Sequence, residues 1–252
     1  MGKIYAILGM SASGKSTIER QLENRGIKRI ISCTTRPMRE GEVQGKDYYF
    51  ISDDKFNSLK EQGDLYENTE YRGWHYSISK TLNNIDLENN DYVVVLEPHG
   101  YKQLVEKVGK DNIVSFYVYI GDKERLMRSI YRVPNPDLKE ICRRYLSDLE
   151  LFSNIDNEVD YCIENKFLLE TTEQIYNIIR KEQLNSIVIN VDDKVAVKKI
   201  NDLNKANHLE HYINKNGTVF SYIHIDGIKK YKVIFKNNES AYFFSDELEI
   251  IN

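Results

Sequence analysis

A short apolar run followed by a glycine-bracketed loop opens the chain and constrains its fold more than any other segment. Residues 3–8 read Lys-Ile-Tyr-Ala-Ile-Leu, which is typical of one buried strand. Residues 9–17 read Gly-Met-Ser-Ala-Ser-Gly-Lys-Ser-Thr and match G-x-x-x-x-G-K-[ST]. Residues 17–24 then predict a helix. Strand, loop and helix in this order predict a phosphate-binding loop (P-loop) in a parallel α/β sheet.

The fixed residues of this loop each suit an anion. Gly9 and Gly14 carry no Cβ, so the backbone can turn and point successive N–H groups inward. Lys15 adds a positive charge beside the β- and γ-phosphates, and the Ser16 hydroxyl is a candidate ligand for Mg²⁺. The N-terminus of the following helix adds a partial positive charge. The residues that we expect to bind ATP here are Gly9, Ser11, Ala12, Ser13, Gly14, Lys15, Ser16 and Thr17.

The composition limits the partners and the location. The chain has 252 residues, of which 41% are hydrophobic and 29% charged, as in ordinary globular domains. Its net charge of −4 gives no overall attraction to nucleic acid, so an anionic substrate needs local clusters of Arg and Lys. No apolar run reaches ~18 residues, so we expect no membrane span. Three cysteines without metal-ligand spacing predict reduced thiols and a cytoplasmic location.

A segment rich in hydroxyls, arginines and turn residues follows a second strand signal at residues 27–32. It runs from Ser32 to Tyr48 and reads Ser-Cys-Thr-Thr-Arg-Pro-Met-Arg-Glu-Gly-Glu-Val-Gln-Gly-Lys-Asp-Tyr. Arg36 and Arg39 can converge on one anion, because guanidinium groups match phosphate oxygens in pairs. The hydroxyl of Tyr48 adds a further donor. Taken alone, these residues are equally consistent with a solvated basic loop.

This segment closely resembles the nucleotide-monophosphate loop of guanylate kinases. The family pattern is Ser-x-Thr-Thr-Arg-x-x-Arg-x-Gly-Glu-x-x-Gly-x-Asp-Tyr, and every fixed position is filled. The resemblance covers about the first 180 residues. It implies that Arg36, Arg39 and Tyr48 grip the phosphate of a nucleoside monophosphate (NMP) and that Ser32 helps to read guanine. It also implies a five-stranded parallel sheet with helices on both faces, and two arms that close over the nucleotides.

The resemblance extends to the acceptor base. A Gly-Asp-Leu-Tyr-Glu segment ends at Glu67, and the matching family Glu accepts from the guanine N1–H and amino group. Tyr76 matches a phosphate-contacting Tyr in a segment usually read as Gly-x-Tyr-Tyr-Gly-Ser/Thr. Ile78 stands at the usual hydroxyl position and cannot hydrogen-bond a base. Ser77 and Ser79 are the nearby hydroxyls expected to compensate.

A continuous β-branched run at residues 92–96 predicts a central parallel strand, and Glu97 follows it directly. The family usually reads Asp/Glu-Ile-Asp-x-Gln-Gly here. Aligned on Gly100, Glu97 takes the place of the second acid and Val95 that of the first. A carboxylate at the end of a strand beside the P-loop is placed for Mg²⁺ or for the substrate. We therefore expect Mg²⁺, arriving with ATP, to have Ser16 and Glu97 as protein ligands, and Glu97 also to contact the NMP.

Arginines recur at helical spacing after a strand signal at residues 113–120. Arg125, Arg128 and Arg132 share one face of a predicted helix. The prolines within residues 133–137 predict an irregular tip after it. The resemblance implies that Arg128 and Arg132 are lid arginines, which close over ATP and neutralise the transferring phosphoryl group. For Arg125 a solvated position on the helix stays open.

A second lid helix is predicted at residues 138–152. Arg143 and Arg144 both fall near the family's returning lid arginine, and the sequence register does not choose between them. Residues 160–165 read Asp-Tyr-Cys-Ile-Glu-Asn and resemble the family's last core strand. The resemblance places Asn165 among the residues that bind ATP.

The resemblance divides the chain near residue 182. Residues 1–182 form the predicted guanylate-kinase-like domain, with an NMP-binding arm at about 33–90 and a lid at about 123–147. Residues 183–252 have no counterpart in guanylate kinases, and we expect a small β-rich α+β domain there, with an SH3-like fold as one candidate. Its predicted elements are a strand at 186–191, a helix at 194–212, strands at 218–225, 231–235 and 242–244, and a hairpin turn at 226–227.

Lysines interleave with aromatic residues in this C-terminal extension, at Lys229, Lys230, Lys232 and Lys236. Such a pattern occurs on surfaces that bind single-stranded nucleic acid, but exposed lysines on edge strands also block aggregation. We favour the second interpretation, because no nucleic-acid-binding motif accompanies the lysines. The extension is instead the candidate surface for a homo-oligomer or for contact with another protein.

Three functions are compatible with these observations. The first is an ATP-dependent kinase of GMP or dGMP. The second is a kinase of a different or modified (deoxy)nucleoside monophosphate, since Val95 and Ile78 remove polar groups near the base. The third is a non-catalytic guanylate-kinase-like binding module, which the intact P-loop and lid arginines disfavour. In all three the expected partners are nucleotides rather than a membrane.

Overall fold

The computed structural model describes residues 2–39, 41–71, 73–201 and 206–251. Its contacts divide the chain into two compact units, Met1–Ile175 and Tyr176–Asn252. The boundary near residue 182 that the sequence suggested stays a prediction. Within the described residues, none of the helices is both long enough and apolar enough to pass through a bilayer.

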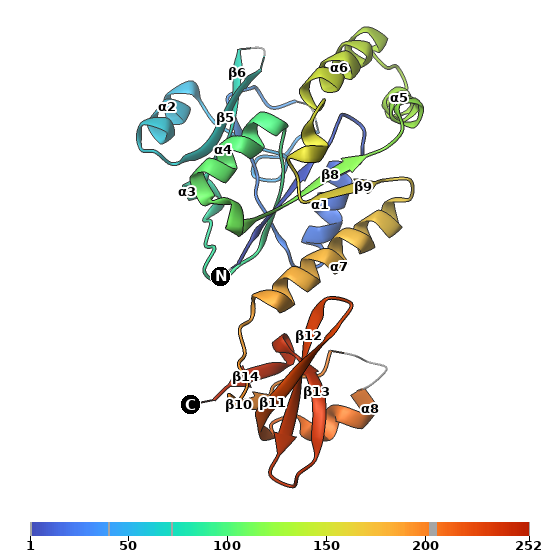
Figure 1. The fold of residues 1–252 in the computed structure, drawn as a ribbon. Helices are drawn as coiled ribbons and strands as arrows, with labels where there is room; N and C mark the ends of the chain where they lie inside the picture. The colour runs from blue at the N-terminus through green and yellow to red at the C-terminus, as the bar shows by residue number, and fades with distance from the viewer. Residues whose placement is uncertain (1, 40, 72, 202–205, 252) are drawn as a thin grey trace. The chain divides into compact units, whose positions relative to one another are not determined.

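A five-stranded parallel sheet forms the centre of the first unit (Figure 1). Its middle strand pairs Ile4 with Tyr92 on one side and with Ile113 on the other. All five residues of this middle strand are fully buried, as expected for a parallel sheet covered on both faces. In spatial order the strands are β2 (Lys28–Arg29), β7 (Tyr92–Val95), β1 (Ile4–Leu8), β8 (Ile113–Tyr119) and β9 (Tyr161–Glu164).

Helices cover both faces of this sheet, which confirms the predicted fold class. Alternate residues of β1, such as Ile4 and Leu8, share an apolar core with residues of α4 (Pro98–Val108). Tyr5 points to the other face, and α1 (Lys15–Glu23) packs on β1 and β7. Shorter helices are α3 (Lys80–Asn83), η1 (Lys110–Asn112) and η2 (Ile155–Asn157), whereas α7 (Leu168–Ser186) begins in this unit and ends in the next.

A four-stranded sheet with one helix forms the first arm, inserted in the chain between β2 and β7. The Ser52 side chain accepts a hydrogen bond from the Lys55 N–H at 3.2 Å and so caps the arm's helix. The strand predicted at residues 27–32 is wrong in extent. Its first residues pair in the central sheet as β2, and the chain then leaves for the arm. The arm consists of β4 (Tyr49–Phe50), β3 (Cys33–Thr34), β6 (Trp74–Ser79), β5 (Leu65–Tyr71) and α2 (Asp53–Glu61).

Two helices, α5 (Asp122–Tyr131) and α6 (Leu138–Leu151), form the second arm. Residues 133–137 between them are not helical, as the two prolines predict. Asp137 caps α6, because its side chain accepts from the Glu140 N–H at 3.1 Å. The residues of this arm that matter below therefore sit on regular helices, except Arg132, which lies directly after the last residue of α5.

A five-stranded antiparallel sheet forms the second unit. Val219, Tyr231, Val233 and Phe243 are almost completely buried in its core. The turn at residues 226–227 has two left-handed residues and joins the two longest strands as a hairpin, as predicted. In spatial order the strands are β13 (Ser240–Phe244), β12 (Ile228–Phe235), β11 (Asn216–Ile225), β10 (Lys194–Val197) and β14 (Leu248–Ile250).

Two elements predicted for the start of the extension are wrong. The strand predicted at residues 186–191 is absent, because α7 continues to Ser186 and an irregular turn follows. The helix predicted at residues 194–212 begins instead as β10, where Val195 and Val197 both point into the core with strand periodicity. Part of that predicted helix, residues 202–205, lies outside the described residues. Short helical turns, α8 (Ala206–Leu209) and η3 (Glu210–Tyr212), follow, and η4 (Ser245–Glu247) precedes β14.

Candidate active site

The loop between β1 and α1 has the geometry of an anion cradle. A Cβ on Gly9 would lie 2.3 Å from the Val118 carbonyl oxygen, and a Cβ on Gly14 would lie 2.3 Å from Asn165 Nδ2. Gly14 also has φ of +100°, a conformation that side chains other than hydrogen rarely allow. A side chain at either glycine would therefore clash with a neighbouring group, and at Gly14 the backbone conformation favours glycine as well.

Lys15 lies under this loop. Its ammonium donates hydrogen bonds to the carbonyls of Gly9 and, at 2.9 Å, Met10. Burial of the ammonium lowers the pKa of Lys15 to about 8, and the carboxylates of Asp148 and Glu97 oppose that shift. The group is therefore positively charged at neutral pH, in a place where water does not screen it well.

Asn165 joins the loop to the lid. It is fully buried, and its Nδ2 donates to the Ser13 carbonyl at 2.7 Å. Arg128 of α5 donates to the Asn165 carbonyl at 3.0 Å. Arg128, Arg132 and Asn165 line one hollow with Ser11, Ala12, Gly14, Lys15, Ser16 and Thr17 of the P-loop. Most of the residues predicted to bind ATP thus surround one space, whereas Gly9 lines the neighbouring cleft and Ser13 is fully buried.

A second cleft contains the residues predicted to hold the acceptor. It measures about 470 Å³, within the range of about 300–1,000 Å³ that is usual for small-molecule sites. Lys15 of the P-loop lines this cleft. The other predicted residues that line it are Ser32, Arg36, Arg39, Tyr48, Glu67, Tyr76, Glu97, Arg143 and Arg144.

Arg36 is the most constrained of the cations that the first arm contributes to this cleft. It is buried, forms a two-pronged ion pair with Glu42 at 2.7 and 2.9 Å, and donates to the Pro37 carbonyl. Its guanidinium also lies 5.6 Å from the ring centre of Tyr48. The hydrogen bonds that Arg36 donates to Glu42 raise the pKa of Arg36, so the cation is fixed in place. Arg39 is exposed on the same loop, and its backbone N–H donates to Glu42.

Glu67, on β5, also lines this cleft. Burial raises the pKa of Glu67 to about 7, and the nearby Glu97 carboxylate adds to that rise. The hydroxyl of Thr69 donates to Glu67 Oε2 at 3.3 Å. Two carboxylates and one hydroxyl therefore line the cleft together with its cations.

The two serines expected to replace the hydroxyl missing at Ile78 do not do so. Both are fully buried. Ser77 donates to the Glu67 backbone carbonyl, and Ser79 donates to a carboxylate oxygen of Asp64. Neither lines the cleft. Ile78 is also completely buried, in the main apolar core of the unit.

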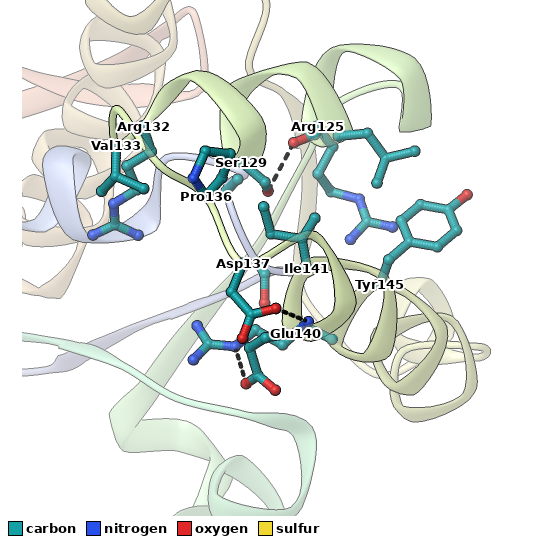
Figure 2. A pocket seen from close by; sticks show the side chains of 13 residues that line it. Arg125, Ser129, Arg132, Val133, Pro136, Asp137, Glu140, Ile141 and Tyr145 are labelled. Atoms are coloured by element: carbon teal, nitrogen blue, oxygen red, sulfur yellow. Dashed lines mark hydrogen bonds and ion pairs between the residues drawn. The ribbon is translucent and has the colours of Figure 1, made fainter.

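Arg125 is a buried lid residue, which overturns the solvated position left open for it. Its side chain is 3% exposed and pairs with Asp148 of α6 at 3.1 Å and with Asp122 at 3.2 Å. Figure 2 shows its guanidinium beside the ring of Tyr145, with 4.4 Å between guanidinium carbon and ring centre. Asp148 also accepts the Ser11 N–H at 2.7 Å and so ties α6 to the P-loop.

Arg143 and Arg144 share one carboxylate. Glu140, one turn earlier on α6, accepts from the Nε of both at 2.8 Å, and these bonds keep the pKa of Glu140 far below its usual range. The Glu140 side chain is among those drawn in Figure 2. Arg143 lines the acceptor cleft, whereas Arg144 lines both that cleft and the hollow around the P-loop. The sequence does not choose which of the two is the returning lid arginine. The lining residues favour Arg144, because it alone of the two lines both spaces.

Sequence reasoning missed Asp148 and Thr69. Each lies at a spacing that puts it on the same face as a residue already singled out: Asp148 is four residues after Arg144 on a helix, and Thr69 is two residues after Glu67 on a strand. The helical spacing of four residues, applied to Arg144, and the strand spacing of two residues, applied to Glu67, would have identified both. The burial of Arg125 has no comparable sequence signal.

A parallel sheet led by a P-loop and flanked by two arms, one with clustered acceptor residues and one with arginines, defines the class of P-loop nucleoside monophosphate kinases. A family model for guanylate kinase matches residues 1–182. The chain belongs to the guanylate kinase family, and the rest of the chain is an extension beyond the matched domain. The family predicted from the sequence is thereby confirmed.

Individual relatives agree with this assignment. Guanylate kinase from Malacoplasma penetrans is 28% identical over 187 residues, which cover 73% of this chain and 95% of that protein. Guanylate kinase from Anaplasma phagocytophilum is 28% identical over 192 residues, which cover 73% of this chain and 89% of that one. A crystal structure of guanylate kinase from that organism superimposes with a TM-score of 0.58 at 26% identity, covering 72% of this chain and 86% of that chain.

Proposed function

We propose that the chain transfers the γ-phosphoryl group of ATP to GMP or dGMP. The observation that carries the proposal is that one cleft is lined both by Lys15 of the P-loop and by Arg36 and Arg39 of the first arm. Phosphoryl transfer asks the protein for in-line positioning, charge neutralisation and exclusion of water rather than for covalent chemistry. An ammonium on one side and guanidinium groups on the other suit that task.

Each side of the cleft has a separate role in this proposal. The P-loop N–H groups and Lys15 hold the ATP phosphates, and Arg128, Arg132 and Arg144 neutralise the charge of the phosphoryl group in transit. Arg143, which lines the acceptor side, supports this charge less directly. No general base is needed, because a phosphate oxygen of the acceptor is already a nucleophile. The residues proposed to aim the acceptor phosphate are Arg36, Arg39, Tyr48 and Tyr76.

The site is compatible with Mg²⁺ delivered together with ATP. Among residues 2–39, 41–71, 73–201 and 206–251, no cluster of three or more His, Cys, Asp or Glu could hold a metal ion. Mg²⁺ at kinase sites is held mainly by substrate phosphates and water, with one or two protein ligands, so such a cluster is not required. Ser16, exposed at the start of α1, and Glu97 are the proposed protein ligands. The ion would supply charge neutralisation between the phosphates.

Guanine is the base that the acidic end of the cleft suits best. Glu67 and Glu97 both line it, and guanine offers N–H donors on one edge at N1 and at the 2-amino group. Ser32, which also lines the cleft, offers a hydroxyl for the 6-oxo group. Adenine and cytosine each present one amino group on that edge and would leave one carboxylate without a donor.

One observation favours a second candidate, a different or modified (deoxy)nucleoside monophosphate. Val95 lines the cleft where an acid would be expected, and Ile78 is buried in the core where a hydroxyl would be expected. Each replacement removes a polar contact near the base. The cytoplasmic location and any protein contact made by the extension stay predictions.

A panel of acceptors tests both candidates. The full-length protein would be assayed with ATP, Mg²⁺ and each common ribo- and deoxyribonucleoside monophosphate in a coupled assay of ADP release. The proposal expects GMP or dGMP to have the highest kcat/KM. A clear preference for another monophosphate would establish the second candidate. Binding of ATP without turnover of any acceptor would point to a binding module and refute both.

Replacing Arg39 by alanine is expected to raise the KM for the acceptor about tenfold or more and to change kcat less. Arg39 is exposed and held through its backbone, so removing its side chain deletes a phosphate contact without disturbing the Arg36–Glu42 pair. Initial rates over a range of GMP concentrations measure the effect. Arg25→Ala, which removes a half-buried arginine that pairs with Glu173 and lines neither cleft, is the matched control. An unchanged acceptor KM would contradict the role of Arg39.

Arg144→Ala is expected to lower kcat by about 10–100-fold, and Arg143→Ala by clearly less. The reason is that Arg144 lines both spaces whereas Arg143 lines one, so Arg144 is the residue able to follow the phosphoryl group. The two variants control for each other, because both remove one guanidinium bonded to Glu140. Saturating steady-state assays give kcat for each. Equal losses, or a larger loss for Arg143→Ala, would overturn the assignment.

A further inference from the structure

The base end of the acceptor cleft lacks a hydroxyl where the family resemblance leads one to expect it. Ile78 is completely buried in the apolar core and does not line the cleft. The neighbouring Ser77 and Ser79 are buried and bonded to the protein itself. Besides the Ser32 hydroxyl, a hydroxyl near Glu67 must therefore come from another residue that lines the cleft.

Thr69 supplies a hydroxyl from the neighbouring strand β5. It is two residues after Glu67, so both side chains lie on the same face of the strand. Its partner across the sheet is Tyr76, one of the residues proposed to hold the acceptor phosphate. Thr69, Glu67 and Tyr76 all line the cleft. Thr69 thus lies between the base-reading acid and a phosphate contact.

The carboxylate of Glu67 is also confined by Gly100. A Cβ placed on Gly100, in the first turn of α4, would lie 3.2 Å from Glu67 Oε2. The same oxygen accepts the Thr69 hydroxyl at 3.3 Å. The absence of a side chain at Gly100 makes room for this oxygen, and the Thr69 hydroxyl holds it. Together they determine the direction in which the other carboxylate oxygen faces the cleft.

We propose that Thr69 is a specificity-determining residue of the acceptor site, which orients the Glu67 carboxylate toward a base that carries two adjacent N–H donors. The inference rests on the proposed function, because it concerns the acceptor base. Hydrogen bonds to an ionised carboxylate contribute more than neutral ones, and their value depends on alignment. A Glu67 carboxylate free to turn would accept from guanine and from hypoxanthine almost equally, because only one of its contacts would be well aligned.

The test measures equilibrium binding of GMP and of IMP, which lacks the 2-amino group, by titration calorimetry on the full-length protein. Thr69→Val keeps the shape and removes the hydroxyl, and Thr69→Ser keeps the hydroxyl. We expect Thr69→Val to weaken GMP binding about tenfold and to reduce the preference for GMP over IMP, with Thr69→Ser close to wild type. Thr218→Val, the same change at an exposed strand position of the second unit, is the matched control.

A pH profile of GMP affinity supplies a readout that a purely structural role would not change. Glu67 accepts two N–H groups when ionised, and the Thr69 hydroxyl favours that form by lowering the pKa of Glu67 against the effect of burial. The other titratable groups that face Glu67 are Glu97 and Cys33, and burial raises the pKa of the Cys33 thiol to about 12. The half-maximal point of the profile should therefore move to higher pH in Thr69→Val and not in Thr69→Ser.

The outcomes separate this inference from the proposed function. Unchanged GMP affinity, GMP/IMP preference and pH profile in Thr69→Val would overturn the role of Thr69 and leave the kinase assignment standing. GMP binding that depends on Thr69, in a protein that turns over no acceptor, would overturn the kinase assignment and support the role of Thr69. No GMP binding by the wild type would overturn the role of Thr69 directly.

Discussion

Replacing Lys15 by alanine is expected to lower kcat by a factor on the order of 10² or more with GMP as acceptor. The ammonium lies under the P-loop, bonded to two loop carbonyls, and it opens into the cleft that also contains the acceptor arginines. A fixed cation in such a place stabilises charge that develops during transfer without having to reorganise. Steady-state turnover at saturating ATP and GMP measures the loss.

Two features of Lys15 make this loss interpretable. Burial lowers the pKa of Lys15 to about 8, so the charged form is disfavoured by folding and its removal should not destabilise the protein. Trp74, the one tryptophan of the chain, lies in the first unit and reports its thermal unfolding by fluorescence. We expect the melting temperature of Lys15→Ala to equal or exceed that of the wild type. Lys60→Ala, an exposed lysine on α2, should retain full turnover.

Lys15→Arg separates charge from shape. Arginine keeps the positive charge, but its planar fork cannot donate to both loop carbonyls as the compact ammonium does. We expect a loss between those of the wild type and of Lys15→Ala. Near-normal turnover in Lys15→Ala would contradict the proposed phosphoryl transfer, whatever the arginine variant does.

The segments that the sequence located best are those in which chemistry fixes both residue type and spacing. In the P-loop, a Cβ at either glycine would meet another group at 2.3 Å, so the pattern can vary little. In the acceptor loop, Arg36 and Glu42 form a local pair six residues apart, and such local requirements leave a readable pattern. The continuous apolar runs of β1 and β7 identified a sheet buried on both faces for the same reason.

What the sequence could not locate depends on contacts between distant segments. Asp148 accepts from Ser11 across 137 positions, and Arg125 is buried because Asp148 and Tyr145 come from another helix. No periodicity within one helix distinguishes a buried arginine of this kind from a solvated one. The prediction for the start of the extension is wrong for a different reason. The sequence predicts Lys194–Val197 as the first turn of a polar helix, but both of its valines point into a core that four other strands complete.

Glu67→Gln is expected to weaken the acceptor strongly and to stabilise the free protein at the same time. The KM for GMP should rise by a factor on the order of 10², because glutamine offers one acceptor oxygen and turns a donor toward the N–H edge of guanine. Initial-rate measurements over a range of GMP concentrations check this. Glu70→Gln, on the same strand and exposed, is the matched control and should leave the KM unchanged.

The sign of the stability change follows from the raised pKa of Glu67. Folding raises that pKa from 4.5 to about 7, so the unfolded chain releases this proton at lower pH than the folded chain does. The stability associated with Glu67 is therefore present below pH 4.5 and is lost as pH rises through 7. At pH 8 the ionised group costs the wild type about 1–3 kcal/mol, a cost that glutamine does not incur.

The measurement is thermal unfolding followed through Trp74 at pH 8 and at pH 5, without nucleotide. We expect Glu67→Gln to melt several degrees above the wild type at pH 8 and nearer to it at pH 5, since about 1 kcal/mol moves the melting temperature by a few degrees in a unit of this size. Glu70→Gln should show no such pH-dependent difference. A Glu67→Gln variant that binds GMP normally, or that melts below the wild type at pH 8, would show that the buried carboxylate is a structural group. We expect instead that the buried Glu67 carboxylate lowers the stability of the free protein and serves acceptor recognition. A preorganised charge must be held where water cannot reach it, and this burial is what costs stability.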